Sequence, residues 1–174
     1  GRYITCNYGY LVATCKSIKT TDNDIFYGLD ANMANLMRPG MYNAYHRISI
    51  PRLYNSNNYI LGNVVGTLCE NNDWFAKQRE LPIGIQKGDL FVIHDTGAHG
   101  FSMGFNYNSK LRSCELIKYN NQIFKIRDRE TLDDLIHNTS FYKNINVIKY
   151  LYIILTMILS VFILFSVYNT FLFN

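Results

Sequence analysis

The chain has 174 residues, enough for one domain with a hydrophobic core and few for two. Its 17 basic and 13 acidic residues give a net charge of +4, and because no basic helix or arginine cluster accompanies that charge, nucleic-acid binding is disfavoured. The four cysteines form no CxxC pair and lack zinc-type histidine spacing; they are Cys6, Cys15, Cys69 and Cys114. This pattern argues against a metal site and a disulfide framework, and indicates reduced thiols in a cytosol-like compartment.

Short β-branched and aromatic runs predict strands along most of the chain. The opening run RYITCNYGYLVATCKSIK is strand-like and, since it starts at Gly1 without a methionine, we expect it to continue something longer. The predicted strands are Tyr10 to Lys19, Ile25 to Asp30, Ile48 to Ile50, Tyr59 to Leu68, Asp89 to His94, Cys114 to Lys118 and Ile123 to Ile126. Between them, ANMANLMRPGMYNAYH contains a proline and a glycine that interrupt any helix, and FAKQRELP is a charged flank that predicts a loop.

Turn signals divide these strands. TTDND and GIQKGD predict turns, and YNNQ predicts a hairpin in which Asn120 and Asn121 accept positive φ. Thr131 and Asp134 have the spacing of a capping box, which predicts one short helix from Thr131 to His137. Six or seven strands with few helices indicate a mainly β domain, either a barrel or a sandwich.

The composition changes beyond Lys149. No charged residue occurs from Tyr150 to Asn174, and this run exceeds the roughly 20 apolar residues that cross a bilayer. Lys143 and Lys149 precede it and favour a cytoplasmic amino side. We therefore expect a β-domain over residues 1–145 and a hydrophobic tail over 146–174, with a membrane helix at 150–173. The alternative is translated sequence beyond a disrupted reading frame; on either interpretation the tail lies outside the core.

Two groups of residues suggest chemistry. In GTLCENNDWF, Cys69 and Glu70 place a thiol beside a carboxylate where a strand gives way to a loop. In RPGMYNAYH, Arg38 supplies a fork for a carboxylate, and Tyr42 and Tyr45 offer phenols nearby. The structural alternatives are a thiol that caps the strand, and a surface arginine beside packed tyrosines.

A glycine-rich loop, HDTGAHGFSMGFNYN, adds a third group. Gly97, Gly100 and Gly104 permit close backbone approach to a ligand, with His99 between two of them, although a plain turn has the same pattern. The chain contains no HExxH, GxSxG or P-loop, so zinc proteases, serine hydrolases and nucleotide hydrolases have no support. The remaining groups suit recognition of a zwitterionic small molecule, with proton transfer by the thiol.

Several strings together resemble one family in order and spacing. GRYI, GYLVATCKSIK, GLDANMANLMRPGMYNAYH, GTLCENNDWFAKQRELP, GDLFVIHDTGAHGFSMGFNYNSKLRSCEL and IRDRET are similar to the carboxyl-terminal part of diaminopimelate decarboxylase, over about residues 1 to 138. This family is a group of pyridoxal-phosphate enzymes of the alanine racemase fold type, also called fold type III. The resemblance implies a TIM-type barrel, which holds the cofactor through a lysine, followed by a β-domain. This chain corresponds to the β-domain without the barrel.

The resemblance also implies roles for five residues. GRYI is similar to the end of the family's EPGR motif, which would place Gly1 at the phosphate of pyridoxal 5'-phosphate and Arg2 near both cofactor and substrate. Arg38 and Tyr42 would bind the distal end of meso-diaminopimelate. His99 stands where many members have tyrosine, in GAHG instead of GAYG, and would contact cofactor and substrate. Without the barrel lysine, we expect the chain alone to be inactive.

Cys69 and Glu70 are implied to act across a dimer. In this fold type Cys69 would donate the proton that replaces the lost carboxylate and Glu70 would hold the distal ammonium, both in the site of the second subunit of a homodimer. CENND stands where many members have CESGD, and Asn71 and Asn72 keep the turn chemistry. The implied function is conversion of meso-diaminopimelate to L-lysine and carbon dioxide in the cytoplasm. The alternatives are an ornithine or arginine decarboxylase of the same fold, and an inactive, membrane-tethered β-module that binds a partner subunit.

Overall fold

The computed structural model describes residues 1–172, with side chains described except at 141–142 and 164–172. The chain divides into two compact units, Gly1–Arg129 and Glu130–Asn174. The first contains all the described strands, so the predicted mainly β fold is confirmed.

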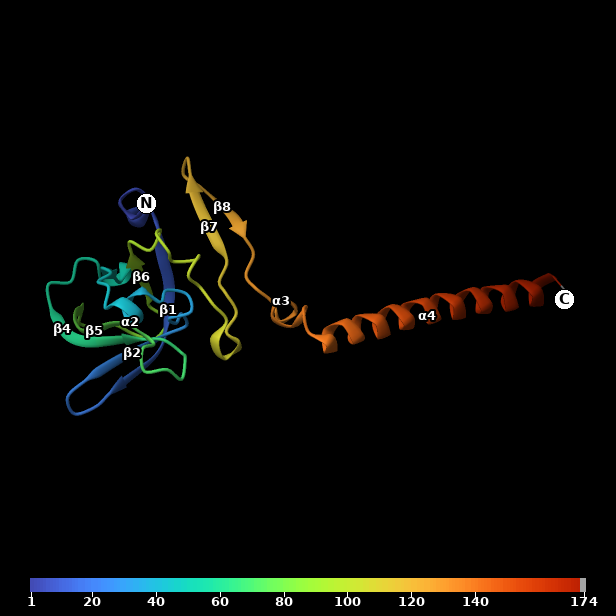
Figure 1. Cartoon of the computed structure of the whole chain (residues 1–174), viewed down its shortest axis with the longest axis horizontal. Coiled ribbons are helices and arrows are strands. Elements are labelled where there is room, and N and C mark those ends of the chain that lie inside the picture. Colours follow the sequence, from blue (N-terminus) through green and yellow to red (C-terminus); the bar gives the residue numbers. More distant parts are fainter. Residues whose placement is uncertain (173–174) are drawn as a thin grey trace. The chain divides into compact units, whose positions relative to one another are not determined.

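A six-stranded sheet forms most of the first unit, in the order β3-β6-β1-β2-β4-β5 (Figure 1). Its strands are β1 (Tyr10–Thr20), β2 (Ile25–Leu29), β3 (Ile48–Ser49), β4 (Tyr59–Val65), β5 (Trp74–Pro82) and β6 (Leu90–His94). Neighbours are antiparallel except β2 and β4, which run parallel. The predicted turn at TTDND is confirmed: it joins β1 and β2 in a hairpin, which closes where the Thr21 N–H donates to the Asp24 carbonyl at 2.8 Å.

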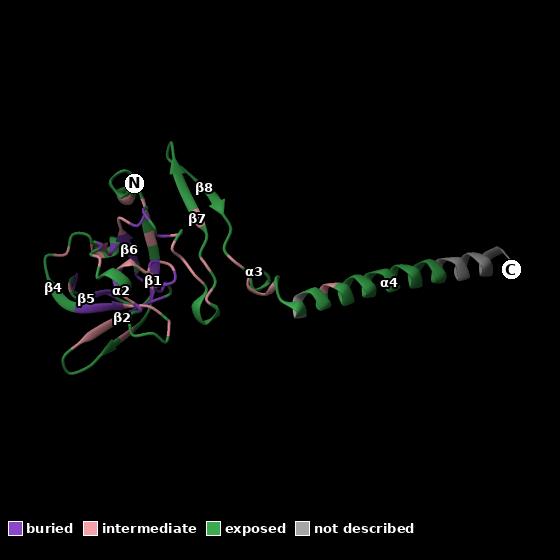
Figure 2. Cartoon of the chain, in the orientation of Figure 1, coloured by how far each residue is buried: buried purple, intermediate pink, exposed green. Residues whose placement is uncertain are grey.

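The hydrophobic core lies within this sheet, where Figure 2 shows the buried segments in purple. Its largest fully buried side chains include Phe75, Phe91, Leu29 and Ile93, which come from β5, β6 and β2. Burial of such side chains is the main favourable term in folding. The core therefore fixes the strand ends from which the site loops emerge.

The prediction of a loop at FAKQRELP was wrong, because these residues form most of β5. Phe75, Ala76 and Leu81 are buried against the core, whereas the charged and amide side chains between them are exposed, except for the half-buried Arg79. Gln78 has φ 45° and interrupts the alternation, opposite a register shift in β4. An antiparallel strand with one solvated face carries charges on that face.

Three short helical segments also differ from the prediction. Residues expected to be strand-like form α1 (Arg2–Thr5) and η1 (Cys6–Tyr8), and the Gly1 carbonyl accepts hydrogen bonds from the first of these turns. The helix α2 (Arg38–Tyr42) contains Pro39 in its first turn, so the proline begins a helix where it was expected to prevent one. Two further turns are η2 (Pro51–Leu53) and η3 (Tyr107–Ser109).

A separate hairpin consists of β7 (Glu115–Tyr119) and β8 (Gln122–Arg127). Asn120 and Asn121 have φ of 45° and 62°, which confirms the predicted positive-φ turn. Arg127 Nε donates to Glu115 Oε2 at 2.6 Å across the open end of the hairpin.

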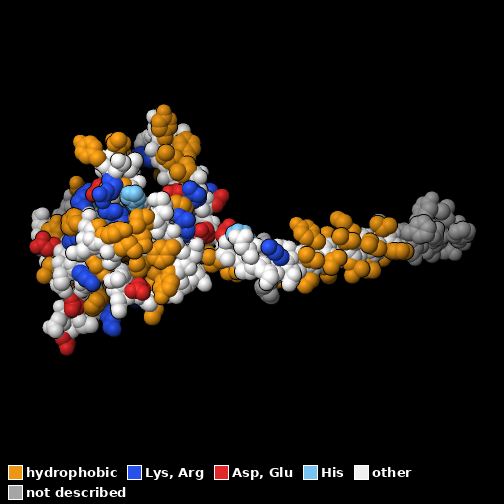
Figure 3. Space-filling view, in the orientation of Figure 1, with side chains coloured by type: hydrophobic (Ala, Val, Ile, Leu, Met, Phe, Trp, Pro, Cys, Tyr) orange, Lys and Arg blue, Asp and Glu red, His pale blue; other side chains and the backbone are white. Residues whose placement is uncertain are grey.

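The second unit is helical. In α3 (Leu132–Ile136) the predicted capping box is present, with the Thr131 N–H donating to Asp134 Oδ2 at 2.6 Å. The helix α4 (Ser140–Leu172) contains the segment Lys143–Ile163, which is long and apolar enough to cross a membrane. Figure 3 shows hydrophobic side chains along its described part. Residues 173 and 174 of the predicted apolar run lie outside the described residues.

Candidate functional site

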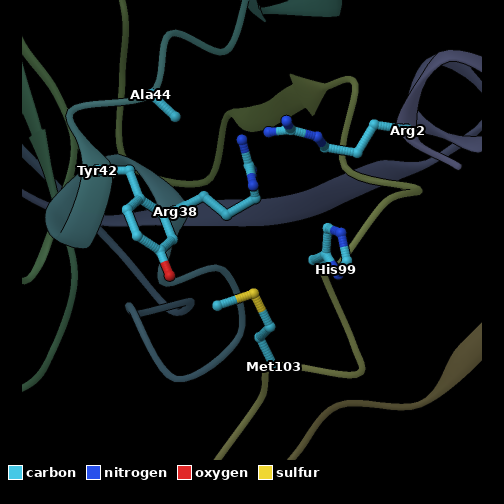
Figure 4. Close-up of a pocket in the computed structure, with 6 residues that line it drawn as sticks. All are labelled: Arg2, Arg38, Tyr42, Ala44, His99 and Met103. Carbon is cyan, nitrogen blue, oxygen red and sulfur yellow. The ribbon is translucent and has the colours of Figure 1, made fainter.

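A cavity of about 570 Å³ brings together residues from three distant parts of the sequence (Figure 4). We call it the arginine cavity, and its lining residues are Arg2, Arg38, Tyr42, Ala44, His99 and Met103. The sequence had singled out Arg2, Arg38, Tyr42 and His99, whereas Ala44 and Met103 were missed. Neither missed residue carries a group whose chemistry stands out in a sequence.

Arg2 reaches this cavity because the first turns of the chain lie directly on the glycine-rich loop. The Gly97 N–H donates to the Cys6 carbonyl at 3.0 Å, and the Cys6 thiol donates to the Asp95 carbonyl at 2.9 Å. A Cβ at Gly97 would lie 2.1 Å from the Thr5 carbonyl oxygen, so only glycine allows this approach. Gly97 therefore leaves room for the chain's own backbone, where the sequence had suggested room for a ligand.

His99 is exposed and has φ 62° in the turn that follows. The next glycine, Gly100, is also needed for backbone packing, because a Cβ there would lie 2.3 Å from the Thr96 carbonyl oxygen. The structural alternative of a turn is thus correct for the glycines themselves. The turn nevertheless presents the His99 ring to the arginine cavity.

Arg38 and Tyr42 lie at the two ends of α2. The Arg38 guanidinium carbon is 5.8 Å from the centre of the Tyr42 ring, a cation–π arrangement. A Cβ at Gly40 would lie 2.1 Å from the Asn72 carbonyl oxygen, so this glycine lets α2 pack on the turn that carries Cys69. Tyr45 does not line the cavity; its ring stacks with the Arg79 guanidinium at 4.0 Å.

The arginine cavity is strongly cationic. Figure 4 shows the guanidinium groups of Arg2 and Arg38 pointing toward one another. Among the side chains that the structure describes, no carboxylate forms an ion pair with either of them. Guanidinium forks match phosphate and carboxylate oxygens in geometry and charge. The donor set therefore fits an anionic group, such as a phosphate or an amino-acid carboxylate.

Cys69 and Glu70 lie outside the arginine cavity. Both are exposed on the turn between β4 and β5, and Glu70 Oε1 accepts a hydrogen bond from the Asn72 N–H at 3.3 Å. Glu70 instead lines a second cavity of about 470 Å³, and the two cavities share no lining residue. The structure thus places four predicted residues on the arginine cavity and two on the exposed turn, whereas Gly1, which is exposed just before α1, lines neither cavity.

Asp73 holds this turn in place, and sequence reasoning gave it no role. One carboxylate oxygen accepts from the Met33 N–H at 2.6 Å and the other from the Leu68 N–H at 2.5 Å. Burial raises the pKa of the Asp73 carboxyl, and the two backbone donors partly oppose that rise. A polar residue directly before the apolar run WFA was the available signal.

His94 ends β6 just before the glycine-rich loop. Arg47 donates to its Nδ1 at 2.8 Å, so the ring proton lies on Nε2 and is donated to the Ser49 hydroxyl, also at 2.8 Å. Burial lowers the pKa of His94, and the Arg47 charge lowers it further. These contacts fix a neutral imidazole at the β3–β6 edge, which anchors the start of the loop.

Comparison with known proteins identifies the family of the sheet domain. Residues 3–97 match a family model described as "Pyridoxal-dependent decarboxylase, C-terminal sheet domain". Among curated proteins, Protein TabA of Pseudomonas amygdali pv. tabaci is 46% identical over 135 residues, covering 77% of this chain and 31% of that protein. Diaminopimelate decarboxylase of Campylobacter jejuni is 42% identical over 136 residues, covering 78% and 33%.

The same relationship holds for solved structures. Diaminopimelate decarboxylase from M. jannaschii in complex with L-lysine has a TM-score of 0.74 and 37% identity, covering 80% of this chain and 31% of that one. The chain thus spans about a third of the length of the relatives it matches. The family match extends over more than half of this sequence and includes Arg38, Tyr42, Cys69 and Glu70. The chain therefore belongs to the pyridoxal-dependent decarboxylases and represents their C-terminal sheet domain.

Proposed function

We propose that the chain forms the C-terminal part of a diaminopimelate decarboxylase, which converts meso-2,6-diaminopimelate to L-lysine and carbon dioxide. The observation that carries the proposal is that Arg2, Arg38, Tyr42 and His99, which come from distant segments, line one cationic cavity. Because the relatives are about three times longer than the matched region, the activity is proposed for the chain joined to the family's remaining portion, with its lysine-bearing barrel. The chain alone is expected to be inactive.

The arginine cavity supplies groups for both cofactor and substrate. Arg2 lines the cavity and its guanidinium favours a phosphate dianion, so it would hold the phosphate of pyridoxal 5'-phosphate, and Gly1, next to it in the chain, would contact the same phosphate. When bound, the cofactor supplies the electron sink that decarboxylation requires. Arg38 and Tyr42 would bind the distal carboxylate of the substrate through a guanidinium fork and a phenol. His99 would contact both molecules from the opposite turn.

Cys69 and Glu70 would complete the site of a second subunit in a homodimer. They line no part of the arginine cavity, which supports a role in another subunit's site. There the Cys69 thiol would deliver a proton to the carbon that has lost its carboxylate, and Glu70 would pair with the distal ammonium. The exposure of both side chains on a turn leaves them accessible for this role.

The first experiment joins this chain to the remaining portion of the Campylobacter jejuni relative. We expect release of carbon dioxide and L-lysine from diaminopimelate, and a large loss of kcat/KM in Arg38→Met. Arg129→Met is the matched control, because Arg129 is exposed and lies outside the cavity. An active enzyme that prefers ornithine or arginine would support the alternative substrates of the same fold. A folded, dimeric but inactive protein would support the alternative of a non-catalytic module.

A second experiment tests the shared site. Two inactive forms, Cys69→Ala and Arg38→Met, are mixed under conditions of verified subunit exchange. Each mixed dimer then holds one site with both groups intact, so about a quarter of the parental sites should recover. No recovery would place the thiol and the guanidinium in the same subunit's site.

We also propose that residues 146–174 act as a membrane anchor for a cytoplasmic β-domain of residues 1–145. The segment Lys143–Ile163 is long enough to span, and within it the hydroxyls of Thr156 and Ser160 donate to carbonyls of the preceding turn. Such internal pairing removes the cost of placing hydroxyls in lipid. Flotation of the chain with phosphatidylcholine vesicles tests the anchor. A chain that stays at the bottom of the gradient would refute the anchor.

A further inference from the structure

His99 and Met103 reach the arginine cavity from one loop, and Phe101 lies midway between them in the sequence (Figure 4). Phe101 is not itself a lining residue of the cavity. Its carbonyl accepts from the Gly104 N–H at 2.9 Å, which closes a turn, and from Arg112 Nη2 at 2.5 Å. The backbone at Phe101 is therefore tied to a side chain that comes later in the sequence.

Two guanidinium groups lie against the Phe101 ring. The guanidinium carbon of Arg112 is 3.7 Å from the ring centre, and that of Arg127, on β8, is 4.3 Å from it. Such cation–π contacts are favourable, but two cations at one ring repel each other. Glu115, on β7, accepts from Arg127 Nε at 2.6 Å and offsets part of that repulsion. We call Phe101, Arg112, Glu115 and Arg127 the Phe101 cluster.

Arg112 also contacts the far end of the turn. A Cβ at Gly104 would lie 3.1 Å from Arg112 Nε, so the guanidinium packs directly on this glycine. Arg112 and Phe101 are both half-buried, and a cation–π contact is worth more when it is partly removed from water. One guanidinium thus contacts the ring, the carbonyl and the glycine of a single turn.

We propose that Arg112 and Arg127 are positioning residues, which hold Phe101 and thereby set where His99 and Met103 lie in the arginine cavity. The β7–β8 hairpin then contributes to the cavity although none of its residues lines it. Without the two cations the turn samples other conformations, and a ligand that needs both side chains in place binds in proportion to the competent fraction. Only the kinetic consequence of this inference rests on the proposed function.

The first experiment follows the His99 ring and Met103 methyl resonances by NMR in the full chain, held in nonionic detergent. Arg127→Met removes one cation and leaves the ring, and because the Arg127 side chain is 56% exposed, this variant should fold even if Arg112→Met does not. We expect both resonances to shift in these two variants and to return most of the way in Arg127→Lys, which keeps the charge. Arg129→Met, the matched control, should change neither resonance, since Arg129 is exposed and outside the Phe101 cluster. Parental resonances in Arg112→Met and Arg127→Met would overturn the proposal.

The second experiment measures the kinetic consequence in the chain joined to the remaining portion of the Campylobacter jejuni relative. Phe101→Leu keeps apolar bulk without the ring, and it should raise KM for diaminopimelate about three- to tenfold. Its kcat should stay within about twofold of the parental value, because the Cys69 thiol is not displaced. Phe101→Tyr restores an aromatic ring and should restore KM.

The kinetic outcomes separate this inference from the proposed function. An equal KM in Phe101→Leu and the parent, or a fall in kcat alone, would show that the Phe101 cluster does not position the cavity. An inactive joined parent would refute the proposed function instead. The His99 and Met103 resonances of Arg127→Met in the full chain would then decide the positioning role, since they require no activity.

Discussion

Removing the Asp73 carboxylate should destabilise the fold more than any other single change on the Cys69 turn. Asp73 is only 6% exposed. In Asp73→Ala, the backbone N–H groups of Met33 and Leu68 therefore lose their acceptors where little water can replace them. Each buried donor left unpaired costs about 1–3 kcal/mol, so the expected loss is roughly 2–6 kcal/mol. Asp73→Asn keeps one acceptor oxygen and should lose about half as much.

The assay is urea unfolding followed by the fluorescence of Trp74, which adjoins the substituted residue on β5. Asp22→Ala is the matched control, because Asp22 is exposed in the β1–β2 turn, and it should stay within about 0.5 kcal/mol of the parent. Hydrogen exchange at the Leu68 and Met33 amides should accelerate only in the Asp73 variants. A free energy of unfolding of Asp73→Ala that lies within ~1 kcal/mol of the parent's, the lower bound for one unpaired donor, would show that these hydrogen bonds do not stabilise the fold.

Three further predictions concern other parts of the chain. Gly97→Ala should force α1 away from the glycine-rich loop, cost about 1–3 kcal/mol in thermal unfolding and weaken phosphate binding through Arg2; unchanged stability and binding would contradict the packing described. Hydrogen bonds from Arg52 lower the pKa of Asp89, so this pair stabilises the fold above the unfolded pKa of about 3.9 and the benefit is lost as pH falls through the folded pKa. Asp89→Asn should accordingly lower the urea midpoint at neutral pH and converge with the parent in acid, whereas a constant difference would refute the linkage. Residues 1–145 expressed alone should be more soluble than the full chain, and greater aggregation of the truncated form would place the tail in the core.

The sequence was informative about the fold wherever side-chain pattern and turn chemistry agreed. The Asn120–Asn121 turn and the Thr131 capping box are local devices, so they were predictable from a few adjacent residues. β5 was missed because its charges lie on the solvated face and Gln78 breaks the alternation. α1 was missed because it is held by tertiary contact with Gly97, more than ninety residues away in the numbering.

In the candidate site, the sequence predicted which residues carry useful functional groups better than it predicted where they lie in space. Arg2, Arg38 and His99 have functional groups that stand out, but their convergence depends on glycine contacts that no local pattern encodes. Asp73 was overlooked because a buried carboxylate that accepts two backbone N–H groups looks, in sequence, like an ordinary turn residue. Its function is visible only when Met33 is brought beside Leu68.

The strand order has a consequence for how the chain acquires its structure. β1 lies in the middle of the sheet, yet one of its two edges pairs with β6, so that edge has no partner until residue 94 has been synthesised. The parallel pairing of β2 with β4 likewise requires the whole segment between them to be made first. Contacts between residues so far apart in sequence slow folding, and an unpaired central strand is exposed to aggregation in the meantime. Folding of this unit on the ribosome should therefore be late and abrupt, with β6 as the strand that completes the sheet.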